Sequence, residues 1–236
     1  MKTLGIIPAR GGSKGVPGKN VMPLLDKPLM GWVIEAAQQA TCFDRLIVST
    51  DSAEIASVAE NYSIDVIKRP ADFANDTAPI DLALRHATAE AEQSDGRYDI
   101  VVWMQANVPT TTTNVIHEVV RSIIDGNADS VATVCPYEVP PQWAWQVNGG
   151  RMLPLEGVYS YSVLRQEQTQ AYHLDGAVNA FRRDILMSTE GQPGQAYFGN
   201  DRGAIIQDRD DSVEIDDPFD LVIAEAILRN RAQSTE

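Results

Sequence analysis

The chain has 236 residues, of which 44% are hydrophobic and 22% are charged, so it can bury a full core within one large domain. Its formal net charge of −14 argues against a nucleic-acid or anionic-membrane partner, and no apolar run is long enough to span a bilayer. Cys42 and Cys135 are expected to be reduced thiols, and no signal peptide is evident, so the sequence predicts a cytoplasmic protein.

A glycine-rich loop follows the first predicted strand, Leu4–Ile7. Residues 6–20 contain four glycines and three cations, which are Arg10, Lys14 and Lys19. Glycines let backbone N–H groups close around a phosphate, and fixed cations offset its charge, so the loop predicts a polyphosphate cradle. Ser13 stands where a Walker A loop needs its first glycine, and no G-x-G-x-x-G is present. The alternative is a surface loop with solvated cations.

Strand-like and helix-like segments alternate through the first half, which predicts an α/β fold with a parallel sheet between helices. The expected strands are 4–7, 45–50, 65–68, 100–105, 129–135, 177–181 and 203–207. The expected helices are 29–40, 52–60, 79–92, 113–124 and 217–231. Asp51 is the expected cap of the second helix, and Asp76 or Thr77 of the third. Asp217 and Pro218 are typical of the start of the last helix.

The alternation breaks at residues 136–175, which contain Pro-Pro, two tryptophans and a Gly-Gly pair. We expect an insertion here, with residues 1–135 and 176–236 forming the nucleotide-binding domain. Trp143 and Trp145 are interpreted either as a partner surface or as the core of the insertion itself.

An acidic segment, residues 212–217, precedes the last helix. Alternation along an extended strand places Glu214 and Asp216 on one face, where two carboxylates can share a cation. Mg²⁺ favours one or two carboxylates that are completed by phosphates and waters. We therefore expect Asp216 to be a direct ligand, and Glu214 a second or water-mediated one.

The motif Pro-Ala-Arg-Gly-Gly-Ser-Lys-Gly at residues 8–15, followed by Pro-Gly-Lys-Asn at 17–20, resembles the signature of the acylneuraminate cytidylyltransferases, the CMP-sialic acid synthetases. The resemblance covers nearly the whole chain and is loosest at 106–175. It implies a Rossmann-like three-layer αβα fold, with residues 136–175 as a small inserted dimerisation and acceptor-sugar subdomain.

The resemblance also implies roles for individual residues. Expected catalytic residues are Arg10, Lys14, Lys19, Arg165 and Asp216. Expected nucleotide-binding residues are Ala9, Arg10, Gly12, Ser13, Asn20, Arg69 and Ala78. Expected sugar-binding residues are Gln105, Arg165 and His173. Thr111 and His173 stand where the family usually has arginine, which leaves sialic acid itself open as the acceptor.

The activity that the resemblance implies is the condensation of CTP with the anomeric hydroxyl of a 2-keto-3-deoxy sugar acid, with release of pyrophosphate and with Mg²⁺ as cofactor. The expected setting is surface polysaccharide biosynthesis by a homodimer. Two alternatives stay open: the same chemistry on Kdo, pseudaminic or legionaminic acid, and a non-catalytic nucleotide-binding homologue.

Overall fold

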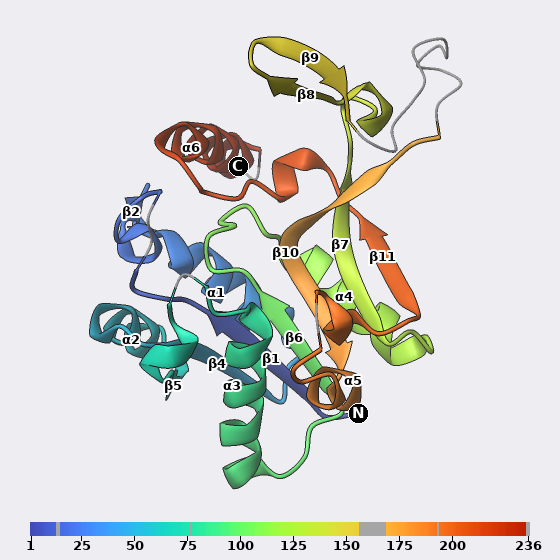
Figure 1. The fold of residues 1–236 in the computed structure, drawn as a ribbon. Coiled ribbons are helices and arrows are strands. Elements are labelled where there is room, and N and C mark those ends of the chain that lie inside the picture. The colour runs from blue at the N-terminus through green and yellow to red at the C-terminus, as the bar shows by residue number, and fades with distance from the viewer. Residues whose placement is uncertain (13–14, 76, 156–168, 193, 235–236) are drawn as a thin grey trace.

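A seven-stranded sheet forms the centre of the computed structural model, which describes residues 1–12, 15–75, 77–155, 169–192 and 194–234 (Figure 1). The strands stand in the order β11-β7-β10-β6-β1-β4-β5. Their bounds are β1 Thr3–Pro8, β4 Arg45–Thr50, β5 Asp65–Lys68, β6 Ile100–Met104, β7 Ser130–Pro136, β10 Tyr172–Arg182 and β11 Arg202–Ile206. β10 pairs antiparallel with β6 and β7, while the other pairings are parallel. The predicted, mainly parallel α/β sheet is confirmed.

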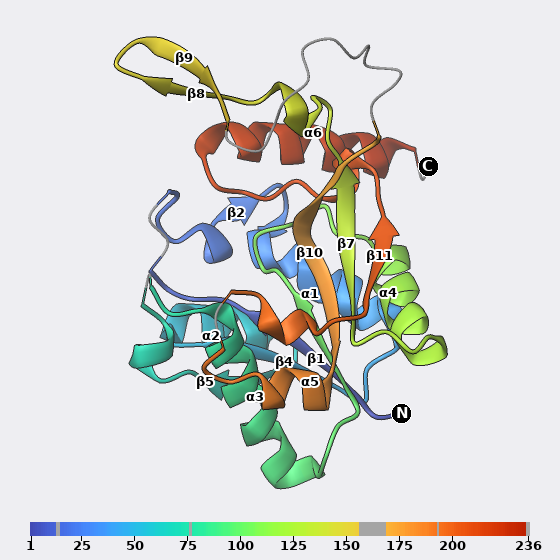
Figure 2. The same ribbon diagram turned by 45° about the vertical axis from the view of Figure 1, so that its right-hand side comes forward.

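Helices cover both faces of the sheet, which gives three layers (Figure 2). The α-helices are α1 Leu29–Ala40, α2 Ala53–Asn61, α3 Ile80–Asp95, α4 Thr113–Asp125, α5 Arg183–Ser188 and α6 Pro218–Gln233. The apolar sides of α1, α2 and α4 pack on one face, with Val33, Ile55 and Val119 in a shared core. On the other face α3 and α5 bury Leu84 and Leu186. The Rossmann-like arrangement is therefore also confirmed.

The residues before the helices explain where the helices begin. Ser52 caps α2, because its hydroxyl accepts a bond from the Ile55 N–H at 3.4 Å, so the prediction of Asp51 as the cap is wrong. Asp51 instead accepts a bond from the backbone N–H of Gly11 at 3.0 Å, which ties the glycine-rich loop to the end of β4. α3 begins after Pro79 without a side-chain cap, so Thr77 does not cap it. Asp76 lies outside the described residues.

The region predicted as an insertion contains more strand than its sequence suggests. β8, Trp145–Asn148, and β9, Arg151–Pro154, form a hairpin that projects from the sheet (Figures 1 and 2). β10 begins at Tyr172, so the strand predicted at 177–181 is only its second half. A register shift lies between Leu174 and Asn179.

α6 closes the end of the molecule at which the glycine-rich loop lies. Its residues Ala224 and Leu228 pack with Leu24, Leu29 and Ile215 in a third apolar cluster. Leu24 belongs to a short ribbon, β2 Pro23–Leu24 with β3 Lys27–Pro28, that precedes α1. None of the helices in the described part of the chain combines the length and apolar character needed to cross a bilayer.

Candidate active site

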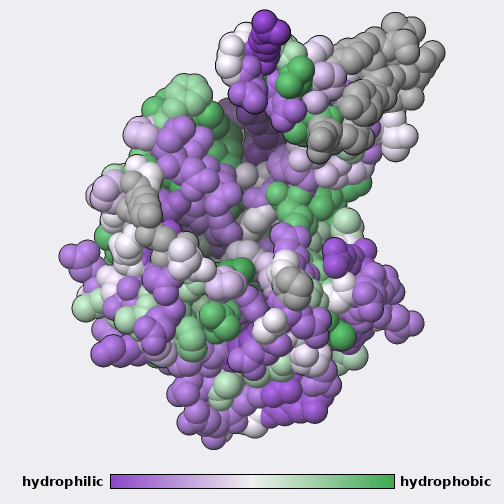
Figure 3. Space-filling model, viewed as in Figure 1, coloured by the Kyte–Doolittle hydropathy of each residue, from purple (hydrophilic) through white to green (hydrophobic). Residues whose placement is uncertain are grey.

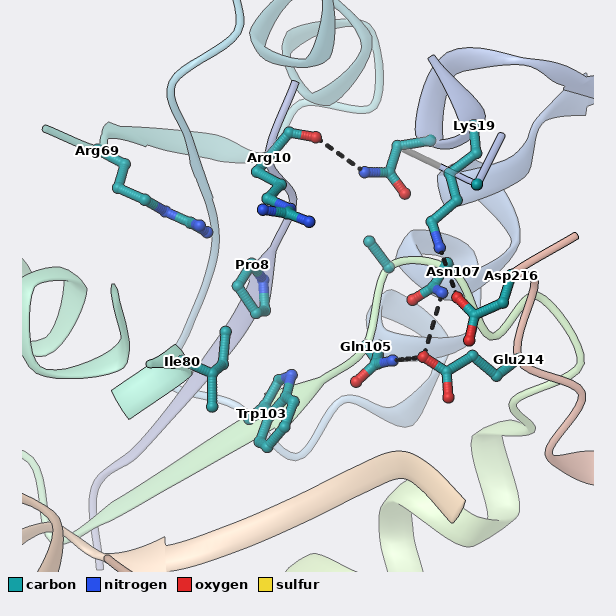
Figure 4. A pocket seen from close by; sticks show the side chains of 13 residues that line it. Pro8, Arg10, Lys19, Arg69, Ile80, Trp103, Gln105, Asn107, Glu214 and Asp216 are labelled. Atoms are coloured by element: carbon teal, nitrogen blue, oxygen red, sulfur yellow. Dashed lines mark hydrogen bonds and ion pairs between the residues drawn. The ribbon is translucent and has the colours of Figure 1, made fainter. Parts of the chain in front are cut away.

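A pocket of about 340 Å³ lies beyond the carboxyl ends of β1 and β6. Ligands of open α/β sheets bind at this end of the strands. Seven residues predicted from the sequence line the pocket: Arg10, Lys19, Asn20, Arg69, Gln105, Glu214 and Asp216 (Figure 4). The cationic first loop and the acidic segment before α6 therefore meet, as the polyphosphate hypothesis requires.

Lys19 joins the two ends of the chain. Its Nζ donates to the carbonyl oxygen of Ile215 at 2.6 Å and to Oδ1 of Asp216 at 3.0 Å. The Lys19 side chain is 15% exposed, whereas that of Asp216 is 71% exposed, so the carboxylate stays open to solvent on its other side. Gly15 makes this approach possible, because a Cβ added there would lie 2.2 Å from the backbone oxygen of Asp216.

Two amides hold Glu214 at the bottom of the pocket. The side-chain amide of Gln105 donates to Glu214 Oε1, and Asn107 Nδ2 donates to the same oxygen at 3.3 Å. Burial, and the negative charge of Asp216 close by, raise the pKa of Glu214 above its usual value. The two carboxylates thus repel one another, and a cation shared between them would relieve that repulsion.

Residues 212–217 are not a strand, so the alternation argument for Glu214 and Asp216 is wrong. The segment instead follows the loop after β6: Ile215 N–H donates to Asn107 O at 2.8 Å, and Val213 N–H donates to Thr110 Oγ1 at 2.9 Å. Both acidic side chains nevertheless line the same pocket.

Arg69, Arg10 and Asn20 also line the pocket, and Arg10 lies between Arg69 and Lys19 in Figure 4. Arg69 is buried and donates to the carbonyl oxygen of Ser49 at 2.8 Å. Burial lowers the pKa of Arg69 from its usual value, which is the sign of a cation short of solvation. Asn20 donates to the backbone oxygen of Arg10 at 3.4 Å, while its own Oδ1 is buried without a partner among the described residues. This oxygen can accept a bond from a ligand.

Four predicted binding residues lie elsewhere. Ala9 is packed into the core, and its N–H donates to Ser49 O at 3.0 Å. Gly12 and Ala78 are not among the described residues that line the pocket. His173 lies in a second pocket of about 450 Å³, where its ring packs against Tyr137 at 4.9 Å between centroids. The backbone bond to Ser49 thus keeps Ala9 in the core. Near Ala78, it is Ile80 at the start of α3 that lines the first pocket.

The second pocket adjoins the first, because Glu214 lines both. His173 therefore lines the pocket that adjoins the one with Arg10 and Lys19. The remaining predicted residues, Ser13, Lys14 and Arg165, lie outside the described part of the chain.

Six lining residues were not among the predicted site residues: Pro8, Gly15, Ile80, Trp103, Ala106 and Asn107. Pro8 and Gly15 belong to the motif of the first loop. The indole Nε1 of Trp103 is buried without a partner among the described residues, although the ring borders the pocket. Asn107 could have been predicted from the sequence, because it stands two residues after Gln105, just beyond the end of β6.

Glu214 and Asp216 form a pair of carboxylates that line the pocket. Across the described ranges no three His, Cys, Asp or Glu side chains gather closely enough to hold a metal by themselves. Glu214 and Asp216 would thus need a ligand's phosphates to complete a Mg²⁺ shell, which is the arrangement that this ion favours.

Comparisons with known proteins identify the family of the chain. The family model described as cytidylyltransferase matches residues 4–148. N-acylneuraminate cytidylyltransferase of Escherichia coli O18:K1:H7 is 30% identical over 98% of this chain, which spans only 53% of that relative. CMP-N,N'-diacetyllegionaminic acid synthase of Legionella pneumophila is 28% identical over 97% of each chain.

Two further comparisons extend the match. Pseudaminic acid cytidylyltransferase of Campylobacter jejuni is 32% identical over 75% of this chain and 77% of its own length. The solved structure of a CMP:2-keto-3-deoxy-manno-octonic acid synthetase complexed with CTP superposes with a TM-score of 0.77 at 18% identity, covering 98% of this chain and 100% of that one. This last likeness concerns the fold. The family model and the pseudaminic acid enzyme show that the chain belongs to the cytidylyltransferase family.

Proposed function

We propose that the protein transfers CMP from CTP to the anomeric hydroxyl of a 2-keto-3-deoxy sugar acid and releases pyrophosphate. The observation that carries the proposal is the meeting of Lys19 Nζ and Asp216 Oδ1 at 3.0 Å inside a pocket that also holds Arg10 and Arg69. Cations that bind a triphosphate and a carboxylate that binds its metal are thereby adjacent. The names of the relatives supply the sugar-acid class of the acceptor.

We assign Arg69 and Asn20, which both line the pocket, to the nucleoside. The unpartnered Oδ1 of Asn20 is an acceptor for a ribose hydroxyl or an amino group, and Arg69 is held rigidly by Ser49. Arg10 stands between Arg69 and Lys19, where the phosphates would lie (Figure 4). Fixed cations there hold the triphosphate in line for attack and offset the charge that develops on the leaving pyrophosphate.

The pocket fits Mg²⁺ by its donor set. Glu214 is partly buried beside Asp216, and burial together with the charge of Asp216 raises the pKa of Glu214. A divalent cation between the two carboxylates would stabilise their charged forms. Asp216 would be the direct ligand and Glu214 the second or water-mediated one. When bound, the ion would lower the pKa of the attacking hydroxyl and screen it from the α-phosphate. Gln105 and Asn107 keep Glu214 aimed into the pocket.

The acceptor has room on the other side of Glu214. The second pocket there combines the apolar Tyr137, Val139 and Ile223 with polar His173 and Ser212, which suits a sugar with both hydroxyl and acyl groups. We assign Gln105 and His173 to this sugar. Arg165 is proposed for the sugar carboxylate because its fork binds such a group bidentately.

A homodimer is part of the proposal. The hairpin β8–β9 projects from the body, and it exposes apolar side chains among hydrophilic ones (Figure 3). These residues are Trp145, Val147, Met152 and Leu153. An exposed apolar patch on a projecting element is typical of a subunit contact. We also place the enzyme in the cytoplasm, where CTP is made, and in the synthesis of a surface polysaccharide.

The test is a pyrophosphate-release assay with CTP, Mg²⁺ and a panel of acids that includes sialic, legionaminic, pseudaminic and eight-carbon keto-sugar acids. We expect turnover with at least one of them and none without acceptor. CTP binding without turnover across the whole panel would favour the non-catalytic homologue instead. Thermal-shift measurement with CTP alone separates that outcome from a complete failure to bind nucleotide.

The variant Asp216→Ala should abolish turnover while the protein keeps its fold. The reason is that the side chain is 71% exposed and its contact with Lys19 is an ion pair near the surface, worth little to stability. The rate of pyrophosphate release and the melting temperature are measured side by side. Unchanged activity would remove Asp216 from the mechanism.

A further inference from the structure

A carboxylate buried behind the pocket has no role in the chemistry described so far. Asp175 on β10 is 6% exposed. It accepts bonds from Thr133 Oγ1 at 2.6 Å, from Ala177 N at 2.9 Å, from Gln207 Nε2 at 2.7 Å and from the Cys135 thiol at 3.5 Å. All four donors are neutral. Burying a charge on neutral donors is costly. Asp175 nevertheless holds two parts of the structure in place that an apolar residue could not.

Asp175 first stabilises the bulge of β10, because it accepts a bond from the backbone N–H of Ala177. Gly176, the next residue, has a φ of +79°, and the register of the strand shifts here. An added Cβ on Gly176 would lie 3.4 Å from Oε1 of Gln105, so the bulge is the surface on which that side chain rests. The backbone of Gln105 also donates to the carbonyl oxygen of Ala177 at 3.1 Å. The bulge thus fixes the amide that donates to Glu214.

Asp175 also contacts, through Cys135, the segment that leads to Glu214. The Cys135 sulfur, which contacts Asp175, also lies 2.9 Å from Oγ of Ser212 and 3.4 Å from the backbone oxygen of Gln207. Ser212 stands two residues before Glu214. A single carboxylate therefore joins the end of β7, the bulge of β10 and the residues after β11. The bulge supports Gln105, and the Cys135 contact supports the segment that leads to Glu214.

We propose that Asp175 is a positioning residue of the enzyme, which holds the carboxylate of Glu214 in place through Gln105 on one side and through Cys135 and Ser212 on the other. It touches neither substrate nor metal. The inference deepens the proposed function and relies on it for the meaning of the kinetic readout. Residues that orient a metal-binding carboxylate commonly change metal affinity or activity by about ten- to a hundredfold when they are removed.

The decisive variant is Asp175→Asn, which keeps the shape of the side chain. One of its two oxygens becomes an amino group, which faces a donor whichever way the amide is turned: Thr133 and Ala177 on one side, Gln207 on the other. The second variant is Asp175→Asn combined with Gln207→Glu. The exchanged pair then again matches one donor to one acceptor, so part of the lost function should return.

Ser130→Ala is the matched control. Ser130 is also buried on β7 and donates to Phe198 O at 2.7 Å, but it lies at the opposite end of the strand from the pocket. All variants are compared by melting temperature, by kcat and KM for CTP, by the Mg²⁺ concentration that gives half-maximal rate, and by hydrogen exchange of peptides that cover residues 105–107 and 212–216.

We expect Asp175→Asn to lower kcat about tenfold or more and to raise the Mg²⁺ requirement, with a smaller change in KM for CTP. Exchange should become faster at 105–107 and 212–216, and the double variant should recover part of kcat. Ser130→Ala should lower the melting temperature without these effects. If Asp175→Asn loses no more activity than Ser130→Ala, or if its exchange at the two segments is unchanged, the positioning role is wrong.

Failure of the proposed function gives a different result. If the wild-type protein turns over no sugar acid, the kinetic measurements give no rate for any variant. Faster hydrogen exchange at residues 105–107 and 212–216 in Asp175→Asn would still support the positioning of Glu214. Unchanged exchange in that variant would overturn the inference whether or not the wild type is active.

Discussion

Lys19 shows how one side chain can couple structure to chemistry. Its ammonium group is largely buried and lies on a carbonyl and a carboxylate, both from the segment before α6. Without a nucleotide, this ion pair neutralises part of the acidic pocket. In the function proposed above, a bound triphosphate would offer this cation a stronger anion, and Asp216 would become available to Mg²⁺.

Replacing Lys19 by alanine should therefore reduce kcat/KM by roughly a hundredfold, the usual loss when one charged donor is removed from a transition state. Lys68→Ala is the control, because Lys68 is an exposed lysine at the end of β5. Steady-state kinetics with CTP compare the two. Equal effects would mean that the glycine-rich loop contributes only charge and no placed contact.

Gly15 is the second residue on which the pocket depends. In Gly15→Ala the new methyl group would lie 2.2 Å from the backbone oxygen of Asp216, so the loop and the acidic segment must separate. A displacement of this order commonly costs about a hundredfold in rate. Gly12→Ala keeps its N–H and meets no atom within 4 Å, so it should be much milder. Similar rates for the two variants would contradict the close approach.

At this scale the sequence predicted a residue whenever a motif or a strand end identified it. Arg10, Lys19 and Asn20 follow from the first loop, and Gln105 from the end of β6. Trp103 could not be predicted in the same way, because its strand looks uniformly apolar and only the packing shows that one ring borders the pocket. His173 lines the second pocket rather than the first, and sequence alone cannot show which of two adjoining pockets a strand residue borders.

Among the elements, the start of α6 determines how Asp216 is held. Asp217 caps the helix by accepting bonds from the N–H groups of Phe219 at 2.7 Å and Asp220 at 3.2 Å. Asp220 closes a capping box and accepts bonds from the N–H groups of Asp216 at 2.9 Å and Asp217 at 2.8 Å. The helix terminus and the proposed metal ligand are thus one hydrogen-bonded unit.

The variant Asp217→Ala should lower the free energy of unfolding by about 1 kcal/mol, the typical loss for a helix cap, with a modest effect on kcat. Asp220→Ala should reduce kcat more, because it frees the backbone of Asp216 itself. Urea denaturation and pyrophosphate release measure the two effects. A larger loss of kcat in Asp217→Ala than in Asp220→Ala would refute this division of roles.

The elements themselves were predictable where local signals and tertiary contacts agree. α1, β4 and β5 have the bounds that their apolar periodicity indicates. The strand expected at residues 212–217 is absent because its N–H groups bond to the loop after β6 rather than to a strand. The reversed direction of β10 and the hairpin β8–β9 depend on pairing between distant segments, and alternation within one segment does not report that.

Across the whole molecule, both cysteines are held as protonated thiols. Burial is the main cause that raises the pKa of Cys42 and of Cys135 to about 11. Both are free thiols, Cys135 fully buried and Cys42 half-buried, as expected for a reduced protein.

The native protein should therefore react very slowly with a thiol reagent such as DTNB at pH 8, where only about one thiol in a thousand is ionised, because a raised pKa removes thiolate at neutral pH. Reactivity should rise as the pH approaches 11 and should appear at once in guanidinium, when both groups return to ordinary pKa values. The absorbance of the released thiolate, measured in native buffer and in guanidinium, gives the number of reactive thiols in each condition. Rapid reaction of two thiols in the native state would contradict the burial described here.

The contact between Lys19 and Ile215 joins positions 196 residues apart. During translation the cationic half of the pocket leaves the ribosome long before its acidic half exists. The pocket is therefore complete only when the segment that contains Glu214 and Asp216 has been synthesised and has docked against the first loop. A premature stop codon between residues 20 and 213 would leave cations of the pocket without its two carboxylates.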